Sequence, residues 1–311
     1  MGKILAICIS EKKGTQKKPI KSARLVEEWG IEGDAHVGKW HRQVSMLSFE
    51  KIEAFREKGA DVDFGAFGEN LVVEGFDLSK VPVGTKFQIG EAILELTQIG
   101  KECHSHCAIY KVMGDCIMPR EGVFTRVLKG GEIKAGDEIT MLPLEKDRPF
   151  TAAIITLSDK GAAGEREDKS GPLIQEMLMK EGYDVIETLL LPDGEQPLKH
   201  QLMRLADQRQ VNVIFTTGGT GFAERDVTPE ATQAVCDRMA MGIADAIRQY
   251  SLSITGRAML SRAVSGIRKK TLIVNLPGSP KAVKESLEYV LPQLGHGLGI
   301  LRGTDGECGN S

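Results

Sequence analysis

A glycine-rich run in the second half of the chain has the composition of a phosphate-binding loop. The run Thr216-Thr217-Gly218-Gly219-Thr220-Gly221 directly follows an apolar stretch. Its glycines allow a tight turn that directs backbone N–H groups at an anion, and phosphate is the natural ligand. The run has neither the Gly-Lys-Ser/Thr ending of a Walker loop nor the G-x-G-x-x-G pattern of a dinucleotide site. An ordinary strand-to-helix turn is the alternative interpretation.

Acidic residues follow the neighbouring apolar stretches. Ser158 and Asp159 leave one stretch, Asp193 lies in Pro192-Asp193-Gly194 after the next, and Asp226 comes shortly after the glycine run. Carboxylates beside a phosphate repel it unless a divalent cation lies between them, so Asp193 and Asp226 together predict Mg²⁺ and a nucleoside triphosphate. Taken singly, Asp193 is equally compatible with a turn residue and Asp226 with a local cap.

A fourth loop, 276–281, ends the last apolar stretch with the sequence Leu-Pro-Gly-Ser-Pro-Lys. Ser279 before Pro280 predicts a helix N-cap, which would present a helix N-terminus and Lys281 to an anion. An ordinary cap beside a solvated lysine is the alternative.

Taken in order, these motifs resemble one known family. The runs 217–221, 226–232 (Asp-Val-Thr-Pro-Glu-Ala-Thr), 261–262, 267–269 and 275–281 are similar to those of the molybdopterin adenylyltransferases of molybdenum cofactor biosynthesis. The resemblance extends over about 150–302. It implies that molybdopterin and ATP are joined, with Mg²⁺ bound, to give adenylylated molybdopterin and pyrophosphate. It also implies a homo-oligomer, with a trimer favoured.

The resemblance carries site roles onto individual positions. It implies that Asp193 and Asp226 are each both catalytic and metal-binding. The substrate-binding set implied at this edge is Ser158, Asp159, Thr217, Gly218, Gly219, Thr220, Gly221, Thr228, Pro277, Gly278, Ser279 and Lys281.

Three cysteines and two histidines crowd into positions 103–116 of the first half. Structural zinc sites usually combine two separated ligand pairs, and this compact cluster lacks that spacing, so no structural zinc is expected. Metal binding by the cluster stays open as one interpretation, and there are two others. The thiols are ordinary buried or surface groups, or one of them is reactive because a neighbouring imidazolium lowers its pKa.

A second resemblance concerns this first half. Gly33-Asp34-Ala35-His36 and the runs 42–45, 67–71, 124–128 and 136–137 are similar to the domain named after the C-terminal part of molybdenum cofactor sulfurases, over about 1–143. That family implies a β-rich barrel and one cysteine that carries sulfur or binds the cofactor. Cys107 is the predicted residue. Cys103 and Cys116 are rivals because the family often has proline where this chain has His106. His36 and His41 stay open between ligand and structural roles.

The elements that must position these residues differ between the two halves. Strand-like runs at 3–9, 43–47, 70–73, 86–89, 92–97 and 138–142, with a hairpin signal at Gly90-Glu91, predict a β-barrel or sandwich, and helix is expected only at 49–58 and 107–113. From 151 onward, strands at 151–157, 183–191, 211–216 and 271–276 alternate with helices of ten residues or more. This order predicts a doubly wound α/β domain with a mostly parallel sheet and its ligands at the carboxyl ends of the strands.

The expected domains are 1–143, a linker at 144–149, an α/β domain at 150–303 and a tail at 304–311. The 311 residues carry a net charge of −3, which argues against nucleic acid or a membrane as the main partner. No apolar run approaches 18 residues, and the N-terminal run is too short for a signal peptide. A cytoplasmic protein with reduced thiols is therefore expected.

Together, the two halves predict a bifunctional molybdenum cofactor protein. Its partners would include a molybdate-insertion enzyme or a sulfur donor. One alternative is a carrier or sensor that holds molybdopterin without turnover. Another is a different nucleotide enzyme on the same fold, such as a pyrophosphatase or a deamidase.

Overall fold

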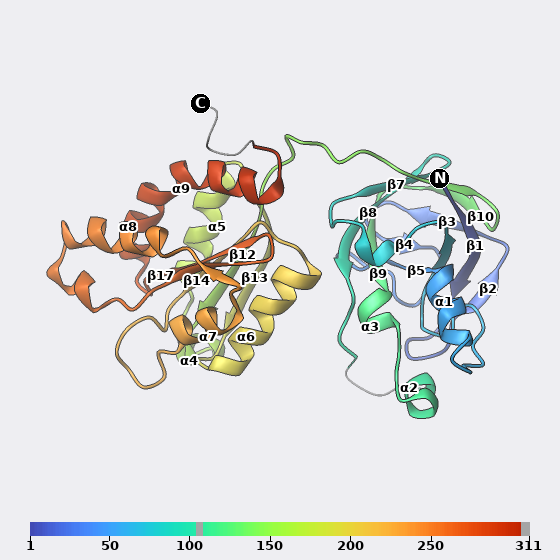
Figure 1. The fold of residues 1–311 in the computed structure, drawn as a ribbon, viewed down its shortest axis with the longest axis horizontal. Coiled ribbons are helices and arrows are strands. Elements are labelled where there is room, and N and C mark those ends of the chain that lie inside the picture. Colours follow the sequence, from blue (N-terminus) through green and yellow to red (C-terminus); the bar gives the residue numbers. More distant parts are fainter. Residues whose placement is uncertain (104–107, 306–311) are drawn as a thin grey trace. The chain divides into compact units, whose positions relative to one another are not determined.

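The computed structural model describes residues 1–103 and 108–305. Two compact units divide the chain, Met1–Glu145 and a second that begins at Lys146 (Figure 1). The division falls within the stretch 144–149, and the expected domain limits stay a prediction. Among the described residues, no helix has both the length and the apolar composition needed to cross a membrane.

The first unit is a closed β-barrel. Seven strands follow one another in the order β11-β7-β8-β9-β5-β6-β1, and pairing between β1 and β11 closes the ring. The ring consists of β1 (Gly2–Ile9), β5 (Val44–Ser48), β6 (Leu71–Glu74), β7 (Lys86–Ile89), β8 (Ala92–Ile99), β9 (Val123–Lys129) and β11 (Glu138–Met141). β2 (Lys18–Ile20) pairs with β1, and a separate small sheet contains β10 (Gly131–Lys134), β3 (Ser22–Val26) and β4 (Gly30–Ile31). The β-rich barrel expected from the sequence is confirmed.

Two apolar clusters explain why strand β5 is buried along its whole length. One cluster contains Val44 and Met46 together with side chains of β7, β8 and β9. The other contains Leu47 together with Ile52 and Phe55 of α1 (Phe49–Arg56). Short helices complete the unit: η1 (Leu78–Lys80), α2 (Ala108–Met113) and α3 (Met118–Glu121).

The second unit is a three-layer α/β domain. Its sheet has the order β13-β12-β14-β17-β16-β15, and the first four strands are parallel. They are β12 (Thr151–Leu157), β13 (Asp184–Leu191), β14 (Val213–Thr217) and β17 (Thr271–Leu276), followed by the antiparallel β16 (Ser265–Arg268) and β15 (Arg238–Met239). The expected α/β class with a mostly parallel sheet is confirmed.

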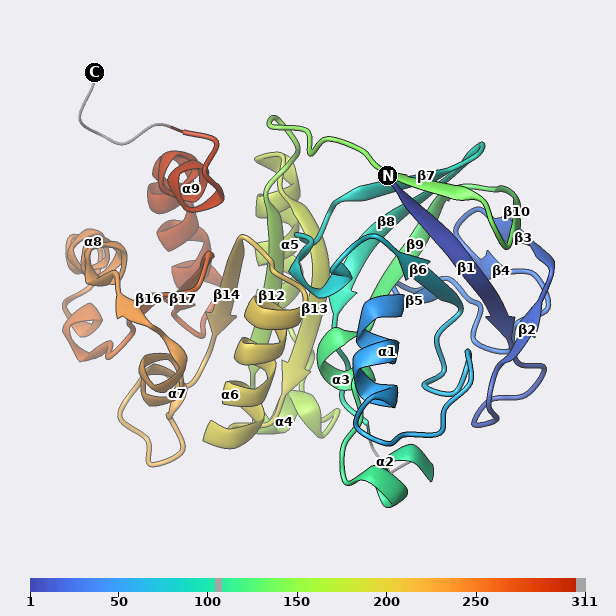
Figure 2. The ribbon, with the colours of Figure 1, turned by 45° about the vertical axis from the view of Figure 1, so that its right-hand side comes forward.

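Helices cover both faces of this sheet (Figure 2). Ala152 and Ile154 of β12 pack toward α5 (Ser170–Lys180) and α9 (Pro280–Arg302), whereas Ala153 and Ile155 pack toward the opposite helices. Those opposite helices are α6 (Glu195–Met203), with its continuation η2 (Arg204–Gln208), and α7 (Thr228–Val235). The strand alternates its side chains between two cores, which is why its sequence is continuously apolar.

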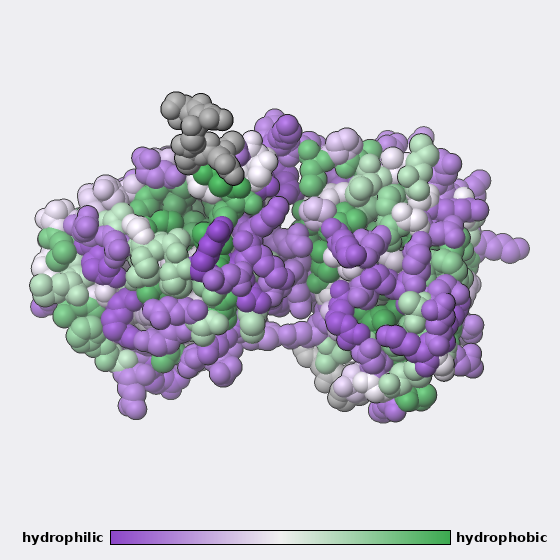
Figure 3. Space-filling model, in the orientation of Figure 1, coloured by the Kyte–Doolittle hydropathy of each residue, from purple (hydrophilic) through white to green (hydrophobic). Residues whose placement is uncertain are grey.

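Several elements of this unit were not predicted. They are α4 (Asp159–Ala162), α8 (Met241–Leu252), η3 (Gly256–Leu260) and the two short antiparallel strands. β16 and β15 have few apolar residues, so only their pairing in the sheet identifies them as strands. Apolar side chains remain exposed on α8 and beyond its end, among them Leu252, Ile254 and Met259, and Figure 3 shows hydrophobic residues at the surface of this unit.

Candidate functional site

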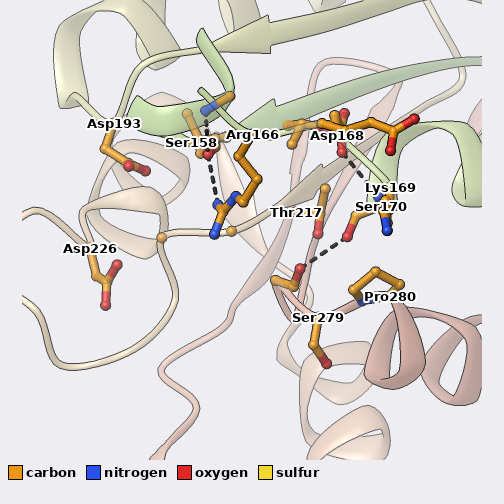
Figure 4. Close-up of a pocket in the computed structure, with 17 residues that line it drawn as sticks. Ser158, Arg166, Asp168, Lys169, Ser170, Asp193, Thr217, Asp226, Ser279 and Pro280 are labelled. Atoms are coloured by element: carbon orange, nitrogen blue, oxygen red, sulfur yellow. Dashed lines mark hydrogen bonds between the residues drawn. The ribbon is translucent and has the colours of Figure 1, made fainter. Parts of the chain in front are cut away.

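A pocket opens in the second unit where strands β12, β13, β14 and β17 end (Figure 4). Its volume is about 690 Å³. The lining residues come from the loops after these strands and from the segment before α5: Thr156, Leu157, Ser158, Gly161, Arg166, Glu167, Asp168, Lys169, Ser170, Asp193, Thr217, Gly218, Gly219, Asp226, Gly278, Ser279 and Pro280. The parallel strands bring these loops together because their carboxyl ends meet at one edge of the sheet.

The glycine run forms a tight loop that tolerates only glycine at two positions. Gly218 and Gly219 have φ angles of +96° and +65°, and a side chain would overlap Leu157 O at the first and Thr228 Oγ1 at the second. Thr228 closes the loop, with its N–H donating to Gly219 O at 3.1 Å and its hydroxyl donating to Gly218 O at 2.9 Å. None of the described residues accepts a hydrogen bond from the N–H groups of 219–221. These donors are available to an anion.

Asp193 is held in place by reciprocal hydrogen bonds with Asp159. The N–H of Asp159 donates to Asp193 Oδ2, and the N–H of Asp193 donates to Asp159 Oδ1, both at 3.0 Å. Arg225 also donates to Asp159 Oδ1 at 3.1 Å and to Asp193 O at 2.6 Å. The remaining oxygen, Asp193 Oδ1, lies 3.7 Å from the place where a side chain on Gly219 would begin. One oxygen therefore orients the carboxylate, and the other faces the glycine loop.

Asp226 approaches the same loop from its far end. Its Oδ2 accepts the Ala223 N–H at 3.0 Å and lies 2.8 Å from the position of a Cβ on Gly221. The local hydrogen bonds of the two aspartates also agree with the alternative roles, a turn residue for Asp193 and a local cap for Asp226. Within the described part of the chain, no three His, Cys, Asp or Glu residues assemble as a metal site. Two carboxylates beside free N–H groups still fit Mg²⁺, which usually takes one or two carboxylates and completes its shell with water and phosphate oxygens.

The opposite end of the pocket is built from hydroxyl groups and a helix N-terminus. Ser170 Oγ donates to Gly278 O at 3.0 Å, and Thr217 Oγ1 donates to Pro277 O at 2.6 Å. The side chain of Ser279 accepts the Ala282 N–H and caps α9, as expected from the sequence. Thr156 Oγ1 is buried and has no hydrogen-bond partner among the described residues.

The segment 166–169 is the main part of the pocket that the sequence analysis missed. Arg166 donates to Ser158 Oγ at 2.8 Å, and Asp168 Oδ1 accepts the N–H groups of Ser170 and Gly171 at 2.9 and 3.0 Å. In Figure 4, Arg166 lies between Asp193 and Asp226 on one side and Asp168 and Lys169 on the other. The run Glu-Arg-Glu-Asp-Lys directly before a predicted helix was the available signal.

The residues predicted for the site of the second unit, catalytic and substrate-binding together, divide into three groups. Those that line the pocket are Ser158, Asp193, Thr217, Gly218, Gly219, Asp226, Gly278 and Ser279. Thr220, Gly221 and Pro277 lie in the same loops, and Asp159 and Thr228 begin the helices α4 and α7, but these five residues do not line the pocket. Lys281 lies outside it, with a side chain that is 82% exposed and 3.8 Å from Glu285.

The cysteines of the first unit lie in different environments. Cys107, the predicted reactive thiol, lies outside the described residues. Cys103 is exposed, whereas Cys116 is only 6% exposed and packs in the cluster that contains Phe55 and Phe67. Burial raises the pKa of the Cys8 thiol to about 12, which keeps that thiol protonated and unreactive at neutral pH.

Two of the sequence motifs of the first unit meet at a buried ion pair. Lys17 Nζ donates to Asp34 Oδ2 at 2.6 Å, and Asp34 also accepts hydrogen bonds from Ser10 N and Asn70 Nδ2 at 3.0 and 3.2 Å. Burial alone raises the pKa of Asp34, but the hydrogen bonds from Lys17, Ser10 and Asn70 outweigh burial and hold that pKa below its ordinary value. The motif residues Asp34 and Asn70 were identified from the sequence, but Lys17 was not.

Two histidines near this cluster have polar neighbours. His41 Nε2 lies 2.8 Å from Gln98 Oε1. His36 Nδ1 lies 3.8 Å from Asp34 Oδ1, and burial, followed by the charges of Lys17 and Lys101, lowers the pKa of His36 below its ordinary value. The described contacts give both imidazoles structural neighbours and no metal ligand set.

Comparison with known proteins agrees with the division of the chain into two units. Residues 153–296 match a family model described as a probable molybdopterin binding domain, and residues 33–140 match the MOSC domain. Molybdopterin adenylyltransferase of Haemophilus influenzae is 44% identical over 147 residues, which cover 47% of this chain and 75% of the relative. The Helicobacter pylori molybdopterin adenylyltransferase is 39% identical over 152 residues, covering 48% of this chain and 86% of the relative. A solved structure of the molybdopterin biosynthesis enzyme MoaB from Thermus thermophilus is 46% identical and covers 50% of this chain and 97% of that one, with a TM-score of 0.48.

Proposed function

We propose that the second unit adenylylates molybdopterin. Through this unit, the chain belongs to the family of the molybdopterin adenylyltransferases, and its first unit carries a MOSC domain. The observation that carries the proposal is that Asp193, Asp226 and Gly219 line one pocket, and that the free N–H groups of 219–221 belong to the same glycine loop. The pocket edge therefore combines what a nucleotidyl transfer needs: donors for phosphate oxygens and carboxylates for a hard cation.

In the proposed reaction, an oxygen of the molybdopterin phosphate attacks the α-phosphorus of ATP. The new oxygen–phosphorus bond replaces the bond from the α-phosphorus to the bridging oxygen, and pyrophosphate leaves. No covalent intermediate with the protein is required. Catalysis then depends on positioning and on stabilising the charge of the phosphate oxygens.

The pocket residues divide this work between them. The N–H groups of 219–221 bind phosphate oxygens, and Asp193 and Asp226 are the residues that would hold Mg²⁺. Bound there, Mg²⁺ would neutralise charge on the triphosphate. Arg166 and Lys169 add positive charge to the pocket, and the α9 N-terminus at Ser279 offers a second place for a phosphate.

The decisive experiment supplies purified full-length protein with molybdopterin and Mg-ATP and follows pyrophosphate and adenylylated pterin. Asp226→Asn is the control, because asparagine keeps an oxygen that accepts the Ala223 N–H while it removes the charge. Formation should fall at least about a hundredfold in the variant. Tight pterin binding without product would identify a carrier, and ATP hydrolysis without pterin would identify a different nucleotide enzyme.

For the first unit, we propose that it binds the molybdenum cofactor or carries sulfur for it, with Cys107 as the thiol. The MOSC-domain match supports this role, and the burial of Cys116 in the core leaves Cys103 as the better placed rival. The protein is first loaded with sulfur from a persulfide donor, and the bound sulfur is then released with cyanide and measured. Cys107→Ser should bind no such sulfur, whereas Cys103→Ser should bind as much as the wild type. The reverse pattern would transfer the role to Cys103.

A further inference from the structure

One arginine contacts both parts of the loop between β14 and α7 that carry proposed active-site groups. Arg262 lies in the segment 261–263, within the short connection 261–264 between η3 and β16. Its backbone N–H donates to Thr220 O at 3.0 Å, and its Nε donates to Gly221 O at 2.7 Å. One terminal nitrogen donates to Asp226 O, and the other pairs with the carboxylate of Glu230.

These contacts clamp both ends of one loop. The carbonyl groups of Gly221 and Asp226 bound the loop 221–226, and both accept from the same planar group. Inside the loop, the N–H of Ala223 donates to Asp226 Oδ2, and the N–H of Asp226 donates to Ala223 O. The span of the guanidinium therefore sets the separation of the loop ends. The free N–H groups of 219–221 lie at one end of this loop, and the Asp226 carboxylate lies at the other.

We propose that Arg262 is a positioning residue that sets the Asp226 carboxylate relative to the phosphate-binding N–H groups. It lies outside the pocket lining and acts through the backbone of the loop. The role depends on the fork shape of the side chain, because a lysine is a single point charge and cannot span two carbonyl oxygens in fixed geometry. This inference rests on the proposed nucleotidyl transfer and adds a residue to it.

A second arginine provides a matched control. Arg248 of α8 holds the same segment from the other side, where its Nε donates to Ser261 O at 3.1 Å and a terminal nitrogen donates to Ala263 O at 2.8 Å. Its other terminal nitrogen pairs with Asp245 at 2.6 Å. Arg248 thus clamps carbonyl groups as Arg262 does, but no hydrogen bond in the described part of the structure joins it to the loop 221–226. Glu230→Gln is a further control, because it removes the ion pair and leaves both carbonyl bonds of Arg262 in place.

The experiment compares R262K, R248K and E230Q in the full chain. In R262K, kcat for pyrophosphate release should fall about tenfold or more, because displacement of a catalytic group by about 1 Å can cost about a hundredfold. The Mg²⁺ concentration for half-maximal rate should rise, and KM for molybdopterin should stay within about twofold. Amide hydrogen exchange of 219–228 should be faster. R248K and E230Q should match the wild type in all four measurements.

Two results would overturn the proposal. One is an R262K enzyme with unchanged kcat or unchanged exchange of 219–228. The other is an equal loss in R248K, which would mean that the segment 261–263 matters only as general structural support. If the wild type itself forms no product, the nucleotidyl transfer is wrong, and Mn²⁺ binding with ATP, followed by electron paramagnetic resonance, tests Arg262 separately. Weaker Mn²⁺ binding in R262K alone supports the positioning role, whereas equal binding or no binding by the wild type overturns it.

Discussion

Single residues of the first unit show how burial changes the contribution of a charged side chain to stability. Lys17 and Asp34 are 3% exposed each, and their ion pair is joined by Ser10 and Asn70. A buried pair of this kind contributes little net stability, but the loss of one partner leaves an uncompensated charge in the interior. The cluster therefore constrains which substitutions the unit tolerates.

Lys17→Met should lower the free energy of unfolding of the first unit by about 3–5 kcal/mol, because it leaves Asp34 charged and buried. Urea unfolding followed by tryptophan fluorescence measures this unit alone, since the two tryptophans of the chain are Trp29 and Trp40. The neighbouring Lys18 is exposed, so Lys18→Met should leave the midpoint unchanged. Equal stability of Lys17→Met and wild type would disprove the buried pair.

Glu69 gives the same unit a pH dependence. Burial raises the pKa of Glu69 to about 7, although the N–H groups of Gly65 and Phe67 donate to its carboxylate. The folded state therefore holds a proton that the unfolded state releases between about pH 4.5 and 7. The contribution of Glu69 to stability is present below that window and is lost as the pH rises through about 7.

The measurable quantity is the unfolding free energy of the wild type minus that of Glu69→Gln. This difference should decrease from pH 5 to pH 8 by an amount on the order of 2 kcal/mol. The subtraction is needed because the pKa of His36 is lowered, which gives the opposite slope below about pH 6.5 in both proteins. A difference that does not change with pH would contradict the raised pKa of Glu69.

At the scale of elements, the last helix of the second unit anchors the start of its first strand. Arg302, at the end of α9, donates to the carbonyl groups of Arg148 and Pro149 and to Asn212 Oδ1. Its guanidinium lies 4.1 Å from the centre of the Phe150 ring, and burial lowers the pKa of Arg302 to about 10. The helix end and the entry to β12 are therefore coupled.

Arg302→Leu should release the residues that lead into β12. Limited proteolysis within 144–149 should become several times faster, and the melting temperature of the second unit should fall by about 2–8 °C, the shift that a loss of 1–2 kcal/mol gives in a domain of this size. Lys281→Met, at the exposed first turn of the same helix, is the control and should change neither quantity. Unchanged cleavage in Arg302→Leu would show that this anchor is dispensable.

At the scale of the whole molecule, the two units each have their own core, and the proposed activities use separate residues. We therefore expect Cys107→Ala to keep adenylylation within about twofold of the wild type. Asp226→Asn should in turn keep the sulfur or cofactor retained by the first unit. Assays of both activities on both variants test this separation, and a loss of adenylylation in Cys107→Ala would instead require passage of an intermediate between the units.

The local patterns of the sequence predicted much of the architecture. Alternating and continuous apolar runs indicated most strands of the barrel and all four parallel strands, because the side-chain period of a strand is a property of the backbone. The glycine run and the two aspartates were predicted to meet because the carboxyl ends of parallel strands lie at one edge. The family matches agree with the resemblance of the second unit to molybdopterin adenylyltransferases. The expected homo-oligomer stays a prediction.

What the sequence by itself determined was therefore the class of each unit and the loops that face the pocket. Only the tertiary structure decided which distant side chains meet. It showed that Lys17 is buried beside Asp34, that Arg166 and Lys169 line the pocket, that Lys281 lies outside it, and that Arg262 joins the two ends of the loop 221–226. Local pattern cannot encode such contacts, because they depend on strand register and on the distances between segments tens of residues apart in the chain.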